Sequence, residues 1–234
     1  KGLNPDAPMR DSGIEWLGEV PAHWKIDKLF RLSNRIGDGL HGTPTYEEGT
    51  GLYFINGNNL EDGRIFIGDS AKEVLPSEFR RHHIEMSDST VLLSINGSIG
   101  KVAIYAYEKV ILGKSAAYIN CLTRLKPGFL QLFFQSDNCK RYYELVSTGT
   151  TISNLSLDSI RQLWIGLPGL EEQESIIEFC TARGKKYDDL IALAFAVVQK
   201  LQERRASLIS GAVTGKIDVR SWKAPESIVE AEVA

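Results

Sequence analysis

The chain has 234 residues, of which 43% are hydrophobic, and this suits one packed domain of about 150–200 residues with an appendage. Its net charge of −3 argues against nucleic-acid binding on composition alone, because most such proteins carry a basic surplus. Residues 1–170 hold 18 Lys and Arg against 19 Asp and Glu, so any cationic face requires local segregation of charge.

No apolar run approaches the roughly 18–20 residues that span a bilayer, and the first residues lack the apolar core of a signal peptide. The three cysteines, Cys121, Cys139 and Cys180, fit neither a disulfide framework nor a Cys-x-x-Cys metal site. We therefore expect a cytoplasmic protein whose thiols are reduced and fill space.

Residues 1–24 predict an extended lead-in with prolines as punctuation and four apolar anchors, namely Trp16, Leu17, Val20 and Trp24. From residue 26 to about residue 168, short apolar runs that suit strands alternate with turns, among them the turn dipeptides Asn56-Gly57, Asp62-Gly63 and Asn96-Gly97. The expected strands are Leu52–Ile55, Arg64–Ile67, Thr90–Ser94, Val102–Tyr105, Val110–Leu112 and Ala117–Leu122. Two helical stretches are also predicted, Glu78–Met86 and Pro127–Ser147, the second from apolar residues near helical spacing. This is the pattern of an α+β domain with a curled, mostly antiparallel sheet and flanking helices.

Pro168-Gly169 marks a boundary, and residues 171–211 have helical composition without proline. Their apolar residues follow a 4-3 spacing, which is typical of a coiled-coil seam. The seam comprises Tyr187, Ile191, Ala194, Val198, Leu201 and Leu208, with Arg205 as its polar member. The alternative is an ordinary long surface helix on its own domain. We predict a domain over residues 1–168, a long spacer or dimerisation helix over 169–213, and a tail over 214–234.

The motifs that carry common enzyme chemistry are missing from the chain. It has no Gly-x-x-x-x-Gly-Lys-Ser/Thr loop, no His-Glu-x-x-His pair and no Gly-x-Ser-x-Gly elbow. His82 and His83 are adjacent, so their side chains point in different directions and suit a metal poorly. We therefore expect no catalytic residue, cofactor or metal.

Three polar, Gly-rich segments between the expected strands could contact DNA: residues 38–46 with 56–59, residues 94–101, and residues 147–155. Glycine allows close approach of backbone to a ligand, Asn can pair with adenine, and Lys, Arg, Ser and Thr can bind phosphates or bases. The alternative is that they are plain hairpin turns, which favour the same residues. The candidate contacts are His41, Thr43, Thr45, Asn56, Asn58, Arg80, Arg81, Asn96, Ser98, Lys101, Lys114, Thr150, Thr151 and Asn154, and Lys140 and Arg141 could add phosphate contacts.

Several stretches in combination resemble the specificity subunit of type I restriction–modification systems. They include Trp16-Leu-Gly-Glu-Val-Pro-Ala-His-Trp24, Asp38-Gly-Leu-His-Gly-Thr-Pro-Thr-Tyr46, Ser94-Ile-Asn-Gly-Ser-Ile-Gly-Lys101, Leu167-Pro-Gly-Leu-Glu-Glu-Gln173 and Ala212-Val-Thr-Gly-Lys216. Gly169 departs from the second proline that is usual in the family. The family carries two recognition domains, each followed by a helix; the first helix typically runs out through Ala-Val-Thr-Lys-Gly-Leu and the second ends in Ala-Val-Thr-Gly-Lys. Because Lys1-Gly-Leu3 and Ala212-Val-Thr-Gly-Lys216 match these two motifs, this chain is similar to the second half of such a subunit.

The resemblance implies a non-catalytic target-recognition domain that reads one half of a bipartite site in double-stranded DNA. It also implies that the helix docks methyltransferase subunits and holds a second recognition domain, which in a half-length form comes from a second copy. A restriction subunit would add translocation and cleavage. Two other hypotheses remain: a scaffold module that assembles through its helix without reading bases, and an enzyme with a small ligand in a deep pocket.

Overall fold

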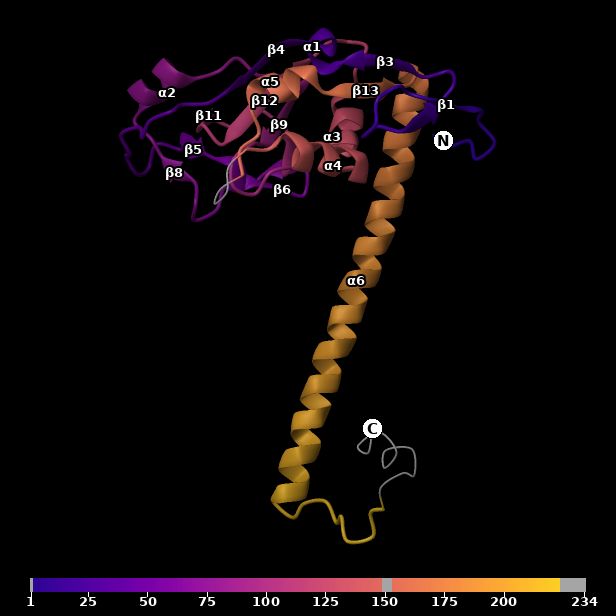
Figure 1. The fold of residues 1–234 in the computed structure, drawn as a ribbon. Coiled ribbons are helices and arrows are strands. Elements are labelled where there is room, and N and C mark those ends of the chain that lie inside the picture. Colours follow the sequence, from indigo (N-terminus) through magenta and orange to yellow (C-terminus); the bar gives the residue numbers. More distant parts are fainter. Residues whose placement is uncertain (1, 149–152, 224–234) are drawn as a thin grey trace. The chain divides into compact units, whose positions relative to one another are not determined.

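The computed structural model describes residues 2–148 and 153–223, which belong to two compact units, Lys1–Phe179 and Cys180–Ala234. We call them unit 1 and unit 2. All strands of the described residues lie in unit 1, together with the first ten residues of the long helix α6 (Leu170–Val213). Figure 1 labels α6 and most of the strands. Within the described ranges, no helix combines the length and the apolar character that crossing a membrane requires.

The central sheet of unit 1 has four antiparallel strands in the order β10 (Val102–Ile104), β9 (Thr90–Ser94), β12 (Ala116–Cys121) and β4 (Ser33–Asp38). Every residue of β9 is buried, as is all of β12 except Asn120. Strands that are covered on both faces read as continuous apolar runs, which explains why these two segments show no alternation.

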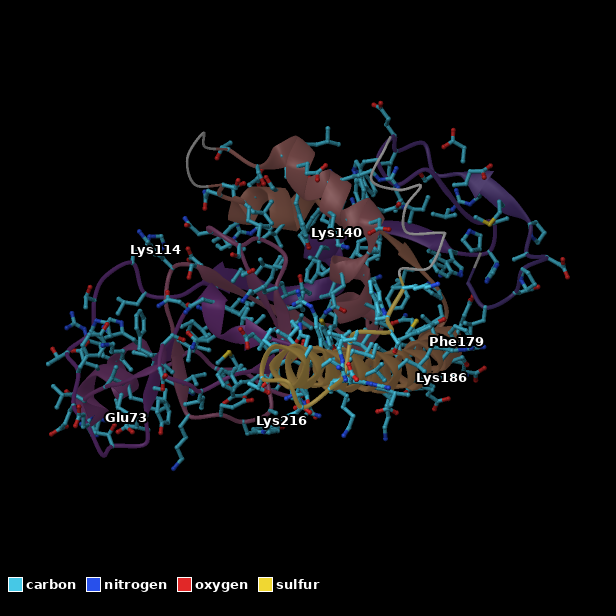
Figure 2. All side chains as sticks on the ribbon, turned by 90° about the horizontal axis from the view of Figure 1, so that it is seen from below. Glu73, Lys114, Lys140, Phe179, Lys186 and Lys216 are labelled. Carbon is cyan, nitrogen blue, oxygen red and sulfur yellow. The ribbon has the colours of Figure 1, made fainter. Side chains whose placement is uncertain are left out.

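A second sheet has the order β11 (Val110–Leu112), β5 (Tyr53–Ile55) and β8 (Lys72–Glu73). Its β11–β5 pair is parallel, whereas β5 and β8 are antiparallel. Helix α2 (Pro76–His82) packs against β11, and Phe79 of this helix lies against the buried side chains of Phe54 and Ile111. This sheet and α2 lie at the end of unit 1 opposite the start of α6 (Figures 1 and 2).

Three two-stranded ladders complete the strands: β1 (Met9–Asp11) with β2 (Glu19–Pro21), β3 (Lys25–Lys28) with β13 (Trp164–Leu167), and β6 (Leu60–Glu61) with β7 (Arg64–Ile65). The β6–β7 turn consists of Asp62 and Gly63, with φ values of 47° and 79°. A positive φ at both residues is the type I′ hairpin turn that Asp-Gly favours, so this turn prediction is confirmed. The strand itself ends at Ile65 rather than Ile67.

The helix predicted over Pro127–Ser147 is wrong as a single element. It consists of α3 (Pro127–Gln135) and α4 (Asp137–Val146), separated by Ser136, which has extended backbone. The Ser136 hydroxyl accepts a hydrogen bond from the Cys139 amide at 3.3 Å and so caps α4. The shorter helices are α1 (Leu29–Leu32), the 3-10 turn η1 (Gly57–Asn59) and α5 (Leu157–Gln162).

The other predicted helix, Glu78–Met86, also has different limits. Helix α2 begins earlier, at Pro76, because proline fits the first helical position, where no amide donor is needed. It ends at His82, since His83 has extended backbone. The hydrophobic spacing therefore located the helix but did not give its ends.

The lead-in packs on the main core of unit 1 through the four anchors expected from the sequence. Leu17 and Val20 are buried, and the ring centroid of Trp16 lies 4.7 Å from that of Tyr142 on α4. Trp24 packs edge-on against Phe129 of α3. The mixed α+β fold with mostly antiparallel, open sheets and a long terminal helix is thus confirmed.

Helix α6 ends in a Schellman motif formed by the Ala212-Val-Thr-Gly-Lys216 stretch. The Lys216 amide donates to the Gly211 carbonyl at 2.8 Å, and the Gly215 amide donates to the Ala212 carbonyl at 3.2 Å. Gly215 has φ +71°, the left-handed conformation that this motif requires and glycine supplies. The side chain of Ile217 lies over Gly211 and covers the last turn.

Candidate nucleic-acid interface

The segment around residues 38–46 is joined to the turn that follows β11. The Leu40 amide donates to the Leu112 carbonyl at 2.7 Å, and the Lys114 amide donates to the Leu40 carbonyl at 3.0 Å. At the other end of this segment, the Thr45 carbonyl accepts from the Leu75 amide, directly before α2. The first candidate segment therefore lies between the β11 turn and the start of α2.

Ser115 connects two further segments to the same turn. Its hydroxyl accepts from the Gly57 amide at 2.9 Å and donates to the Asn56 carboxamide oxygen at 3.0 Å. Its carbonyl accepts from the Ile95 amide at 2.9 Å. Sequence reasoning missed Ser115, because one serine between two apolar strands is typical of any turn.

Asn96 and Asn154 join the second segment to the third. Their backbones form an isolated antiparallel bridge, and the Asn96 side-chain nitrogen lies 3.4 Å from the Asn154 side-chain oxygen. Next to them, the Gly97 amide donates to the Ser153 carbonyl at 3.0 Å, and the Leu155 amide donates to the Ile95 carbonyl at 2.8 Å. The three segments thus meet in one surface region. We call it the loop junction, made of Leu40, Asn56, Ile95, Asn96, Ser115 and Asn154.

Glycines in and beside the loop junction serve packing between backbones. A Cβ atom at Gly39 would lie 2.0 Å from the Leu112 carbonyl oxygen, and one at Gly57 would lie 2.6 Å from that of Ser115. A Cβ atom at Gly113 would lie 2.2 Å from the Asn56 side-chain oxygen. The expected reason for Gly39 and Gly57 was close approach to a ligand, and the structure gives packing between the loops instead. Gly97 differs, since no atom lies within 4 Å of the position that a Cβ atom would take there.

The candidate contacts in these segments differ in exposure. Asn56 and Asn154 are partly buried and carry the hydrogen bonds of the loop junction. His41 is exposed, with its Nε2 atom 2.7 Å from the Asp38 carboxylate. The exposed side chains are those of His41, Thr43, Thr45, Asn58, Ser98 and Lys114.

The cationic candidates lie in several places. Arg80 and Arg81 are exposed on α2, and Lys114 is exposed in the turn after β11. Lys140 on α4 pairs with Asp137 at 3.1 Å, and Arg141 donates to the Asn138 side chain. Lys101 is also close to a carboxylate, because its Nζ atom lies 3.6 Å from Glu61 of β6. Figure 2 labels Lys114 and Lys140 on unit 1.

A hollow of about 560 Å³ opens where the second and third segments meet α4. Gly97, Ile99, Lys140 and Ser153 are among the residues that line it, together with the buried Tyr143. Burial raises the pKa of Tyr143 well above its ordinary value. The candidates Thr150 and Thr151 lie outside the described residues.

The other strongly shifted groups belong to the core of unit 1. Burial raises the pKa of Cys121 and that of Cys139 to about 12. Burial also raises the pKa of Tyr142 to about 12. Among the described residues, no group of three or more His, Cys, Asp or Glu side chains could hold a metal ion.

The predicted seam of α6 is exposed along unit 2. Tyr187, Ile191, Val198, Leu201 and Leu208 are between 49% and 59% exposed, and Ala194 is exposed as well. Three neighbouring apolar side chains, Leu190, Leu193 and Val197, are also exposed and widen the apolar face. A helix face of this kind is available for packing against another helix.

Comparison with known proteins gives a consistent result. Residues 80–192 match the family model of the type I restriction modification DNA specificity domain. The chain is 24% identical over 210 residues to a Methanocaldococcus jannaschii protein named as the MjaX specificity subunit of a type I restriction enzyme. That match covers 88% of this chain and 46% of the relative, so the chain spans about half the length of the relative.

Two solved structures have the same fold. A chain from a structure concerned with complex assembly and conformational transition of the type I R-M system gives a TM-score of 0.64 at 18% identity, over 82% of this chain and 46% of that one. The HsdS subunit from Thermoanaerobacter tengcongensis gives 0.57 at 18% identity, over 78% and 41%. The family model, the relative and the two structures agree: residues 80–192 match the DNA specificity domain of type I restriction–modification systems, and the chain is similar in sequence and fold to specificity subunits of such systems.

Proposed function

We propose that this chain selects a DNA sequence for a type I restriction–modification complex and catalyses nothing itself. Unit 1 reads one half of a bipartite target in double-stranded DNA. The observation that carries the proposal is the loop junction, because three separate polar segments meet there through hydrogen bonds between residues far apart in the sequence. A junction of this kind holds several reading side chains in fixed relative positions, as base recognition requires.

Charge supports the placement of the DNA face. Lys114 lies in the turn that the loop junction shares, and Arg80 and Arg81 lie on α2, which packs against the strand before that turn. These exposed cations can bind phosphates and set the register of the protein on the duplex. The overall charge is nevertheless −3, so the isolated chain gains little from counterion release and should bind DNA weakly.

The partners in this proposal are supported by the apolar face of α6 together with the family. Methyltransferase subunits dock on this helix and supply S-adenosylmethionine binding and methylation, and a restriction subunit supplies translocation and cleavage. A second recognition domain is held at a fixed distance through the seam, and a second copy of this chain can provide it. We place the complex in the cytoplasm, where the DNA is.

The test compares variants of the chain with methyltransferase subunits present. Lys114→Ala should weaken binding to all sequences and lower the salt slope by about 1, because one phosphate contact is lost. Lys109→Ala is the matched control, since Lys109 is an exposed lysine at the opposite end of β11. Anisotropy titrations at several salt concentrations measure both effects. Equal behaviour of the two variants would contradict this placement of the DNA face.

Base reading needs a separate measurement. Asn96→Ala should change the preference at single positions of the methylated motif by about 1–3 kcal/mol per base pair, because it removes the amide that can pair with a base. Methylome sequencing of a host that carries the chain and its methyltransferase gives the motif directly. Methylation by the purified chain alone would contradict the non-catalytic role.

A second candidate function is a helical assembly module that does not read bases, favoured by the exposed seam of α6. It predicts that variants of the loop junction leave DNA binding by the assembled complex unchanged. The Asn96→Ala experiment therefore distinguishes the two functions.

A further inference from the structure

Gln173 is a fully buried polar residue in the first turn of α6, with 0% of its surface exposed. Its side-chain nitrogen donates to the carbonyls of Arg124 and Pro168, both at 3.0 Å. Its side-chain oxygen accepts from the Lys126 amide at 2.8 Å. One carboxamide thus connects α6 to the loop before α3 and to the junction after β13.

This position requires a carboxamide. The two carbonyls need donors and the amide needs an acceptor, and glutamine offers both from one neutral side chain. A carboxylate would keep the acceptor, but it would repel the two carbonyls and leave them without a donor. An apolar side chain would leave all three buried groups unpaired, which is unfavourable in the protein interior.

The neighbouring contacts hold the same two turns of the helix, but they are more exposed. Glu172 accepts from the Trp24 indole nitrogen at 3.0 Å, and it lies 2.9 Å from the His23 ring nitrogen. Glu174 pairs with Lys126 at 2.7 Å, and Ile177 packs over Gly128. Surface pairs of this kind contribute little, because water screens them. Gln173 is therefore the residue whose hydrogen bonds most strongly fix the start of α6.

We propose that Gln173 is a positioning residue that fixes the direction and rotation of α6 at its attachment to unit 1. The second half of the inference rests on the proposed function: through α6, Gln173 keeps the gap between the two half-sites constant. Gln173 itself contacts neither DNA nor a partner. Its loss should leave the recognised bases unchanged and make the gap variable.

The first test measures the attachment directly by spin-label distances in the full chain. One label is placed at Asp88→Cys, directly before β9, and the other at Ala182→Cys on α6, before Gly184; both positions are exposed, and Cys180→Ser removes the remaining accessible thiol. Nine residues of helix are about 14 Å long, so a tilt of roughly 15° at Gln173 moves residue 182 by about 4 Å. Gln173→Met should widen the distance distribution at least twofold, and Gln173→Glu should do the same.

The matched control is Ser175→Ala. Ser175 is an exposed polar residue in the same turns, and its hydroxyl donates only within the helix, to the Glu171 carbonyl at 3.0 Å. It should leave the distribution unchanged. Unchanged widths in both Gln173 variants would overturn the inference. So would failure of both variants to fold, as judged by their thermal unfolding, because Gln173 would then be a core residue of unit 1 and not a positioning residue.

The second test measures the gap between the half-sites in methylated DNA. The wild-type chain and the Gln173→Met chain are expressed separately with the methyltransferase, and both methylomes are sequenced. The variant should methylate the same half-sites with gaps that differ by about one base pair or more, because base pairs are spaced 3.4 Å apart. If methylation falls equally at all sites and no sites with a different gap between the half-sites are methylated, Gln173 has a merely structural role. A wild-type methylome without a bipartite motif would contradict the proposed function, whereas the spin-label result would still stand.

Discussion

Apolar side chains of the same type are buried in unit 1 and exposed in unit 2. In unit 1, Leu92 and Leu93 are 0% exposed, whereas in unit 2 Leu193 and Leu201 are 62% and 59% exposed. Burial of apolar surface contributes about 25 cal/mol per Å², so unit 1 gains its stability from its own contacts. The exposed apolar face of unit 2 lacks this contribution in the isolated chain, so burying it against another helix would add to its stability.

The largest expected difference between the units comes from one substitution made in each. Phe134→Ala, in the same core cluster as Leu93, should destabilise unit 1 by about 3–5 kcal/mol, because it removes a buried ring and leaves a cavity. Phe195→Ala, at a ring that is 71% exposed, should change stability by less than about 0.5 kcal/mol in the monomer. Urea unfolding followed by tryptophan fluorescence measures the first, and circular dichroism measures the second. Similar values would mean that the difference in burial does not determine stability.

The next largest effect concerns assembly through the seam. If two copies pair there, Leu201→Lys should weaken the dimer by roughly 700-fold, because each of the two copies loses about 2 kcal/mol of leucine burial, about 4 kcal/mol per dimer. Gln199→Lys is the control, since residue 199 lies on the other side of the helix. Sedimentation equilibrium at tens of micromolar gives both dissociation constants. A strict monomer, with no difference between the variants, would contradict pairing of two copies.

Two glycines of unit 2 should respond with opposite signs. Gly184→Ala should stabilise α6 by about 1 kcal/mol, because the residue is helical and nothing lies within 4 Å of its Cβ direction. Gly215→Ala should destabilise the helix end by about 1 kcal/mol, because φ is +71° there. Circular dichroism during thermal unfolding measures both changes. A loss of helix in Gly184→Ala would indicate that this position needs glycine for another reason.

The smallest effect at neutral pH concerns the thiols of unit 1. Burial raises the pKa of Cys121 and Cys139 to about 12, so both stay neutral and unreactive in the folded chain. In the unfolded chain they ionise near pH 8.5, so the contribution of these thiols to stability is full below that pH and is lost as the pH rises toward 12. Alkylation by iodoacetamide at pH 8 should modify Cys180, which is partly exposed, well before the other two. Equal labelling of all three would contradict their burial.

The sequence predicted helices and turns well where neighbouring residues along the chain carry the pattern. The 4-3 spacing located α6, and the Asp62-Gly63 turn was identified from its dipeptide. Some errors were avoidable: Ser136 followed by Asp137 is a helix start signal, and it marks the break between α3 and α4. Contacts between distant segments could not be predicted, because nothing at Ser115 or Gln173 shows which backbone groups these side chains will meet.

The glycines show the same limit. Gly39, Gly57 and Gly113 all read as turn residues, and turns are where they lie. In the structure these three glycines pack against other loops, whereas Gly97 faces open space. The difference depends on the register of strands that are far away in the sequence, so the local sequence does not show it. The residues proposed to contact DNA stay predictions for a related reason: the sequence and the fold show which side chains are exposed, and base contacts depend on a duplex.

The capped end of α6 has a consequence for how this helix opens. Most helices exchange their amide hydrogens fastest at the two ends, where the hydrogen bonds break first. Here the first turn is fixed by Gln173, and the last turn is closed by the hydrogen bonds to Gly211 and Ala212. Gly184 weakens the part between them. Amide exchange in the free chain should therefore be fastest inside the helix, around Gly184, and slower at both ends.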